Sequence, residues 1–230
     1  SLRGDEVMQV VSGRLDQPIV HYEAPPRIDL PKQLDDFIVW FNFTRDHKQI
    51  DPIIRAAITH LWFVTLHPFE DGNGRLTRTL TDLALTQMDT QSIRLYAMSA
   101  TILVHRSDYY LILEQTQKGG LDISLWMDWF INCFIEALEQ VQVKIKLTQE
   151  RTIFWQRHAD KQLKSEQIKV LNRLLEGGEG NFPEGISASQ YQKVAKVSKA
   201  TATRHLAELL EKKCLIKLPG GGRNTRYGIG

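Results

Sequence analysis

The chain has 230 residues, of which 42% are hydrophobic and 24% charged, and its formal net charge is +2. This composition is typical of a soluble globular protein with room for two ordinary domains. No apolar run approaches the roughly 20 residues of a membrane helix, so we expect no membrane partner. The two cysteines, Cys133 and Cys214, are far apart in apolar surroundings, which favours reduced thiols in a cytoplasmic protein. The first residue is not methionine, so we expect the chain to begin inside a longer sequence.

Charge is distributed unevenly along the chain. From residue 161 onward there are 13 Lys and Arg against 6 Asp and Glu, a net charge of +7, whereas residues 1–160 carry −5. An acidic first part and a basic second part indicate different partners for the two parts.

Residues 1–150 are expected to form one mainly helical domain with a small hairpin. Two β-prone runs within 7–22 predict the hairpin, and the prolines at 25 and 26 end it. Apolar spacing predicts a helix near 30–41, another from Asp51-Pro52 to His67, and a third from about Asn73. Two more helices are expected, at 99–116 and 124–147.

Residues 166–230 are expected to form a winged helix-turn-helix domain, joined to the first by a connecting helix or linker at 151–165. Helices are predicted at 166–175, 189–194 and 199–212. Two short strands, 214–218 and 225–229, flank a proline- and glycine-rich turn, which is typical of a wing.

The segment 67–78, His-Pro-Phe-Glu-Asp-Gly-Asn-Gly-Arg-Leu-Thr-Arg, combines groups that suit nucleotide chemistry. The turn of Gly72, Asn73 and Gly74 precedes a helix, whose free N–H groups and dipole favour phosphate. Arg75 and Arg78 lie three residues apart and can both contact phosphate oxygens.

Two further groups in this segment point to group transfer. Asp71 offers hard oxygen ligands for Mg²⁺ next to the phosphate-binding turn. His67 lies where the preceding helix ends, and the nearby helix start should keep its ring neutral and able to accept a hydroxyl proton. Each residue alone has an ordinary structural explanation, but their combination in twelve residues favours a nucleotide-handling enzyme.

The pattern His-Pro-Phe-x-Asp-Gly-Asn-Gly-Arg-x-x-Arg resembles the signature of the Fic (filamentation induced by cAMP) family at every specified position. The hairpin, the Pro-Pro segment, residues 40–42 and residues 57–78 resemble the Fic subfamily that carries a C-terminal winged helix. The resemblance implies a Fic-type helical core and transfer of AMP from Mg·ATP to a hydroxyl group of a target protein or of the chain itself.

The resemblance also implies roles for individual residues. His67 would deprotonate the target hydroxyl, Asp71 would hold Mg²⁺, and the hairpin at 7–22 would align a target segment by strand addition. The phosphate- and adenine-binding residues would be Gly72, Asn73, Gly74, Arg75, Arg78, Tyr109, Tyr110 and Gln117. For Tyr109 and Tyr110, simple helix packing is an equally good explanation.

Two features of the resemblance concern specificity and regulation. Gly74 stands where kinase-like members carry lysine, so it favours AMP transfer. The inhibitory motif Ser/Thr-x-x-x-Glu-Gly/Asn of many Fic proteins does not occur in the 230 residues, so we expect an N-terminal inhibitory part to be absent and Arg78 to be free.

The basic second domain supports an alternative from another class of protein, a DNA-binding transcriptional regulator whose Fic-like domain only senses nucleotide. DNA contacts would come from residues 186–230, namely Lys199, Thr201, Thr203, Arg204, Arg223 and Arg226. Protein binding is an equally good use for such a domain. The target protein and the formation of a homodimer are left open by the sequence.

Overall fold

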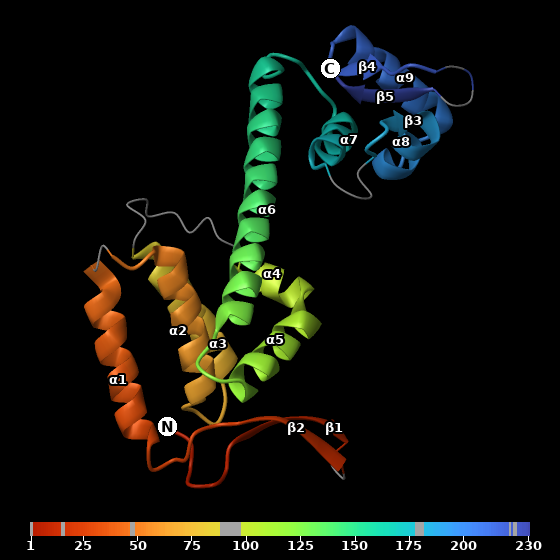
Figure 1. Ribbon diagram of the computed structural model, residues 1–230. Coiled ribbons are helices and arrows are strands. Elements are labelled where there is room, and N and C mark those ends of the chain that lie inside the picture. The colour runs from red at the N-terminus through yellow and green to blue at the C-terminus, as the bar shows by residue number, and fades with distance from the viewer. Residues whose placement is uncertain are drawn as a thin grey trace. The chain divides into compact units, whose positions relative to one another are not determined.

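The computed structural model describes residues 2–14, 17–46, 49–87, 98–177, 182–220, 222 and 225–230. The chain divides into two compact units, Ser1–Val141 and Gln142–Gly230. The expectation of a mainly helical chain with a small hairpin in its first part is confirmed (Figure 1). Within the described ranges, no helix combines the length and apolar character needed to cross a membrane.

The first unit consists of a hairpin followed by helices. Its elements are β1 (Gln9–Arg14), β2 (Gln17–Glu23), α1 (Leu30–Phe43), the short 3₁₀ helix η1 (Thr44–Asp46), α2 (Pro52–Leu66), α3 (Asn73–Thr86), α4 (Met98–Val104), α5 (Arg106–Lys118) and the first part of α6 (Ser124–Arg157). The two strands are antiparallel, with a register shift between Val10 and Val11.

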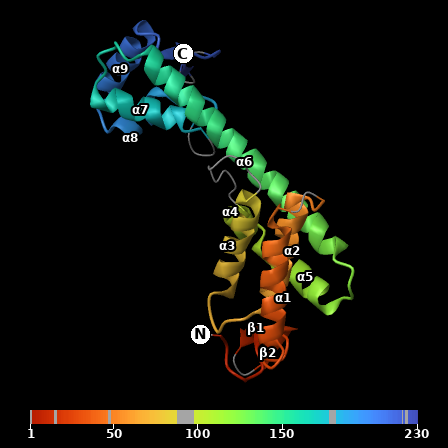
Figure 2. The same ribbon diagram turned by 90° about the vertical axis from the view of Figure 1, so that its left-hand side faces the viewer.

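Helix α2 is the centre of the first unit. Most of its residues are buried, because it packs against α1 on one side and α3 on another (Figure 2). Asp51 begins the helix by accepting hydrogen bonds from the N–H groups of Ile53 and Ile54, at 2.8 and 3.2 Å. The surrounding core is rich in aromatic side chains, including Phe37, Phe63, Trp126 and Phe130.

Two expected helix boundaries differ from the structure. The helix expected at 99–116 is two helices, because the backbone of His105 leaves the helical region between α4 and α5. The helix expected at 124–147 continues to Arg157, because the buried Phe154 anchors its last turns in the core of the second unit. Apolar spacing alone did not distinguish a one-residue break from a continuous helix.

The second unit contains the rest of α6, three further helices and a small sheet. Its elements are α7 (Ser165–Leu175), β3 (Ile186–Ser187), α8 (Ala188–Ala195), α9 (Lys199–Glu211), β4 (Leu215–Lys217) and β5 (Arg226–Ile229). The sheet is antiparallel in the order β3-β5-β4, and the sequence did not predict β3. A separate core includes Val170, Tyr191, Leu206 and Leu209.

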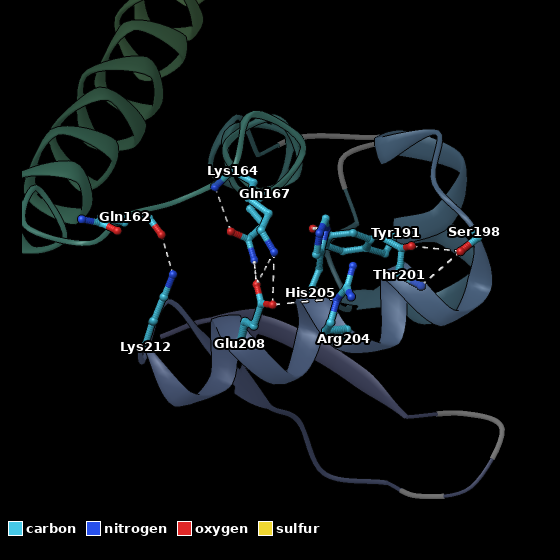
Figure 3. A network of polar contacts seen from close by, with 10 residues as sticks. All are labelled: Gln162, Lys164, Gln167, Tyr191, Ser198, Thr201, Arg204, His205, Glu208 and Lys212. Carbon is cyan, nitrogen blue, oxygen red and sulfur yellow. Dashed lines mark hydrogen bonds and ion pairs between the residues drawn. The ribbon is translucent and has the colours of Figure 1, made fainter.

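A network of polar contacts joins α7, α8 and α9 (Figure 3). Glu208 on α9 accepts hydrogen bonds from Lys164 at 3.1 Å and from Gln167 at 2.9 Å. The hydroxyl of Tyr191 lies 3.2 Å from Nδ1 of His205, and burial lowers the pKa of this histidine. These contacts fix the orientation of α9 within the second unit.

Candidate active site

The loop between α2 and α3 begins at His67. The backbone of His67 is left-handed, with φ 45° and ψ 56°, and its N–H donates to the carbonyl of Phe63 at the end of α2. Pro68 follows and disfavours helical backbone at the preceding residue, which explains why α2 ends here. The same turn directs the ring of His67 into the wall of a cavity.

The ring of His67 is held in a form that can accept a proton. Its Nδ1 lies 3.3 Å from the carbonyl oxygen of Val64, so Nδ1 carries the hydrogen and Nε2 keeps its lone pair. Burial lowers the pKa of His67, and the nearby positive charge of Arg3 lowers it further, against the opposing effect of the Val64 hydrogen bond. The expected neutral ring therefore has burial as its main cause, rather than the helix start.

The turn after the loop positions the start of α3. Gly72 adopts φ 86°, a left-handed conformation that glycine reaches without strain, and its N–H donates to Oδ1 of Asp71 at 2.6 Å. The side chain of Asn73 is buried and bonds twice to Phe69, accepting from its N–H at 3.0 Å and donating to its carbonyl at 2.7 Å. Asn73 therefore fastens the loop, which leaves its main-chain N–H as the group at the helix start.

The two arginines of the motif have different surroundings. Arg75 is exposed and pairs with Asp71, with 3.2 Å between Nη2 and Oδ2. Arg78 is half-buried in the cavity wall and has no hydrogen bond or ion pair within the described ranges. A Cβ added at Gly74 would lie 3.5 Å from Nη1 of Arg78, so glycine leaves space beside this guanidinium.

The cavity has a volume of about 520 Å³ and lies between the hairpin, α2, α3 and α5. The expected site residues in its lining are His67, Gly74, Arg78, Tyr109, Tyr110 and Gln117. The other four, Asp71, Gly72, Asn73 and Arg75, belong to the same loop and helix start but do not line the cavity. The structure thus brings together segments of the chain that are 50 residues apart.

The two tyrosines serve different purposes. Tyr109 is buried, and its hydroxyl lies 3.0 Å from Nε2 of His60, so its body belongs to the core. Burial is also the main reason that its pKa is raised. Tyr110 is 50% exposed, and the guanidinium of Arg106 lies 5.6 Å from its ring centre. An exposed ring backed by a cation forms a flat surface on which a purine can stack.

Several residues of the site carry no recognisable sequence signal. Arg106 lines the cavity, and His21 on β2 contacts Glu114 on α5 with 2.6 Å between Nδ1 and Oε2. The other ring nitrogen of His21 lies 2.5 Å from the hydroxyl of Ser12 on β1. His21 and Glu114 are 93 residues apart, and only the folded chain brings them together. We call Ser12, His21 and Glu114 the hairpin clamp.

The possible metal ligand is a single carboxylate. Within the described ranges, no three His, Cys, Asp or Glu side chains form a group that could hold a metal ion. Asp71 nevertheless fits a Mg²⁺ ion that arrives with a nucleotide, because Mg²⁺ is commonly bound by one or two carboxylates together with substrate phosphates and waters.

In the second unit, most of the candidate DNA contacts lie on the first half of α9. Lys199, Thr203 and Arg204 are exposed, and Thr201 is half-buried. Arg226 lies within a contact network of its own unit, because it donates to the carbonyl of Gly185 at 3.0 Å and pairs with Glu184 at 3.7 Å. The last candidate, Arg223, lies outside the described residues.

Comparison with known proteins identifies the N-terminal part of the first unit. Residues 4–85 match the family model of the Fic/DOC family. The chain carries a Fic domain. This domain includes the hairpin, α1, α2 and most of α3, and its motif contributes His67, Gly74 and Arg78 to the cavity.

Relatives of the Fic domain occur in animals. The chain is 37% identical over 90 residues to "Protein adenylyltransferase fic-1" of Caenorhabditis elegans, which covers 39% of this chain and 16% of the relative. It is 33% identical over 109 residues to "Protein adenylyltransferase Fic" of Nematostella vectensis, which covers 47% of this chain and 24% of the relative. The chain thus spans less than a quarter of the length of these relatives.

A solved structure is similar over both units. A Fic family protein from Desulfovibrio desulfuricans G20 matches with a TM-score of 0.50 and 20% identity, covering 96% of this chain and 60% of that protein. At this identity, the likeness shows the fold alone.

Proposed function

We propose that this chain is a protein adenylyltransferase, which transfers AMP from ATP to a hydroxyl side chain of a target protein, including its own. The observation that carries the proposal is the position of His67, whose ring lines the same cavity as Gly74 and Arg78. The relatives named protein adenylyltransferase add support at partial coverage.

The proposed reaction assigns a step to each group. The target oxygen attacks the α-phosphorus of ATP, the bond between the α-phosphorus and the bridging oxygen breaks, and pyrophosphate leaves. Nε2 of His67 takes the hydroxyl proton, because Nδ1 is committed to Val64. The N–H groups at the start of α3 and the guanidinium of Arg78 bind the phosphates. Arg75 would contact the outer phosphates from the exposed side of the loop.

We propose Asp71 as the Mg²⁺ ligand and the ring of Tyr110 as the adenine surface, with Gln117 beside it. A bound Mg²⁺ ion would supply neutralisation of the phosphate charge. Gln117 donates to the hydroxyl of Thr65 at 3.1 Å, which leaves its amide oxygen free to contact the adenine base.

The hairpin would pair with an extended segment of the target protein. We propose that the reaction takes place in the cytoplasm, where ATP is plentiful.

Replacement of His67 by Ala tests the proposal. We expect AMP incorporation from Mg·ATP to fall by at least about 100-fold, because the proton acceptor is lost, while ATP affinity stays near that of the unmodified chain. The measurement is mass spectrometry of a 5′-adenylyl adduct together with nucleotide binding by calorimetry. Unchanged adduct formation would remove His67 from the mechanism, and a pure nucleotide sensor would form no adduct with either protein.

We propose, as a second role, that the second unit is a winged helix that binds DNA through the first half of α9. The exposed Lys199 and Arg204 favour contacts with DNA phosphates, and Lys193 and Lys196 lie close by in the sequence, exposed and without a carboxylate partner in the described chain. A regulator that only senses nucleotide receives no support from the relatives' names.

A gel-shift titration tests DNA binding. Replacement of Lys199 and Arg204 by Ala should weaken binding about fivefold or more and reduce its dependence on salt, because two phosphate contacts are lost. The matched control replaces Lys144 and Lys146, two exposed lysines of α6, by Ala and should leave the shift unchanged. Equal effects of both pairs would indicate only a general response to charge.

A further inference from the structure

A basic groove lies in the second unit, at the end of α9 remote from Lys199. It has a volume of about 670 Å³ and is formed by the end of α6 with the following turn, the end of α9, and β4. All charged residues that the structure places in its lining are basic: Arg157, Lys161, Lys212, Lys213 and Lys217. The volume is within the usual range for ligand sites, roughly 300–1,000 Å³.

Most of this positive charge lacks a compensating carboxylate. Lys161 pairs with Asp160 at 3.2 Å, and Lys212 donates to the carbonyl of Gln162, a neutral group (Figure 3). In the part of the chain that the structure describes, the remaining three lining cations have no acidic partner within 4 Å. The contact with Gln162 holds the Lys212 ammonium in place without neutralising it.

The groove also follows the free edge of a β-sheet. In the order β3-β5-β4, β4 is an edge strand. The carbonyl of Cys214 accepts from Gly230, and the N–H of Leu218 donates to Arg226, so these residues direct their backbone groups toward β5. Because backbone groups alternate along a strand, those of Leu215 and Lys217 point the other way, and no partner for them lies among the described residues.

Apolar groups line the same space. Leu215 is 1% exposed beneath the groove, whereas the side chain of Ile216 is 50% exposed beside it. Within the described ranges, the one ring that lines the groove is the imidazole of His158, which is 4% exposed and has both nitrogens in contact with backbone carbonyls, so bases of a nucleic acid would find no open ring to stack on. A peptide in extended conformation, by contrast, matches a strand edge through its own N–H and C=O groups.

We infer that this groove binds an acidic, extended peptide segment of a partner protein, which adds to β4 as a further strand. Main-chain hydrogen bonds to Leu215 and Lys217 fix the register of the segment. Its carboxylates face Arg157, Lys213 and Lys217, and its alternate apolar side chains contact Ile216. This interaction is independent of the chemistry proposed at His67.

The test uses the full chain and a short fluorescent peptide of alternating Glu and Val, with binding measured by anisotropy at physiological salt. Replacement of Lys213 and Lys217 by Glu should weaken binding about tenfold or more. The matched control replaces Lys193 and Lys196 by Glu, which makes the same charge change outside the groove and should alter binding less than about twofold. Each pair includes one lysine with left-handed backbone, Lys213 or Lys196.

Two further measurements decide between occupants. On peptide binding, hydrogen exchange of the Leu215 and Lys217 amides should slow, while a peptide of alternating Gln and Val should bind much more weakly. The inference is overturned if both charge reversals act alike, or if the neutral peptide binds equally well. It is also overturned if double-stranded DNA displaces the peptide and itself loses affinity in the Lys213 and Lys217 variant, which would make the groove a nucleic-acid site.

Discussion

Burial lowers the pKa of two histidines in the Fic domain, but only one of them keeps a ring nitrogen without a partner among the described residues. His67 is partly buried at the cavity wall, where a lowered pKa leaves Nε2 free to take a proton. His60 is fully buried in the same domain and uses both ring nitrogens, contacting the hydroxyls of Thr81 and Tyr109 at 3.0 Å each. Burial lowers the pKa of His60 to about 3, so its ring stays neutral at pH 7 and well below it.

The stability of the Fic domain should therefore depend on His60 in acid. Below the ordinary pKa of 6.5, the unfolded chain takes up a proton at His60, whereas the folded chain does not until about pH 3. Stability should thus fall as the pH decreases through this window, by up to about 1.4 kcal/mol per pH unit from this residue. Urea unfolding followed by tryptophan fluorescence at several pH values measures the slope.

The His60→Gln variant isolates this contribution, because an amide can still bond to Thr81 and Tyr109 but does not titrate. Its stability at pH 7 will be lower, and its dependence on pH between 6.5 and 3 should be shallower than that of the unmodified chain. His105→Gln serves as the control, since His105 is partly exposed beside Glu136. Equal slopes for both variants would contradict the assignment.

The position of the hairpin depends on a few contacts with distant parts of the chain. β1 and β2 form an isolated two-stranded sheet, and such a sheet is marginally stable alone. The hairpin clamp joins both strands to α5, and the hydroxyl of Tyr22 donates to the carbonyl of Thr65 at 2.8 Å, which adds a tie to α2. Burial raises the pKa of Tyr22 to about 12, so this tie persists at high pH.

Replacement of His21 by Ala should release the hairpin without unfolding the domain. Because these groups are partly exposed, we expect a modest effect, roughly fivefold faster hydrogen exchange of the β1 and β2 amides. The control is Lys32→Ala, which breaks an exposed ion pair with Asp36 on α1. Unchanged exchange in His21→Ala would mean that the clamp does not hold the hairpin.

At the scale of the whole molecule, the predictions that succeeded rest on local chemistry. The cap at Asp51, the glycine turn before α3 and the hairpin follow from neighbouring residues, and each forms as expected. The break at His105 and the continuation of α6 to Arg157 depend on packing between distant segments, which no local pattern records.

The same distinction applies to the candidate functional residues. The motif placed His67 and Arg78 in one cavity because twelve consecutive residues form one loop and helix start. The contact between His21 and Glu114, and the commitment of Arg226 to Gly185 and Glu184, arise only when remote segments meet. Charge counts identified a basic second part. Only the fold shows that its cations belong to two surfaces, one on the first half of α9 and one in the groove beside β4.

The two hydrogen bonds between Asn73 and Phe69 have a consequence for the nucleotide binding that we propose for this loop. A flexible glycine-rich loop would lose conformational entropy on gripping a triphosphate, and that loss would subtract from the binding free energy. Here the loop is already immobilised by its own asparagine before any nucleotide arrives. We therefore expect the proposed enzyme to bind ATP with few direct contacts. Removing the Asn73 amide should weaken ATP binding through disorder of the empty loop rather than through a missing contact.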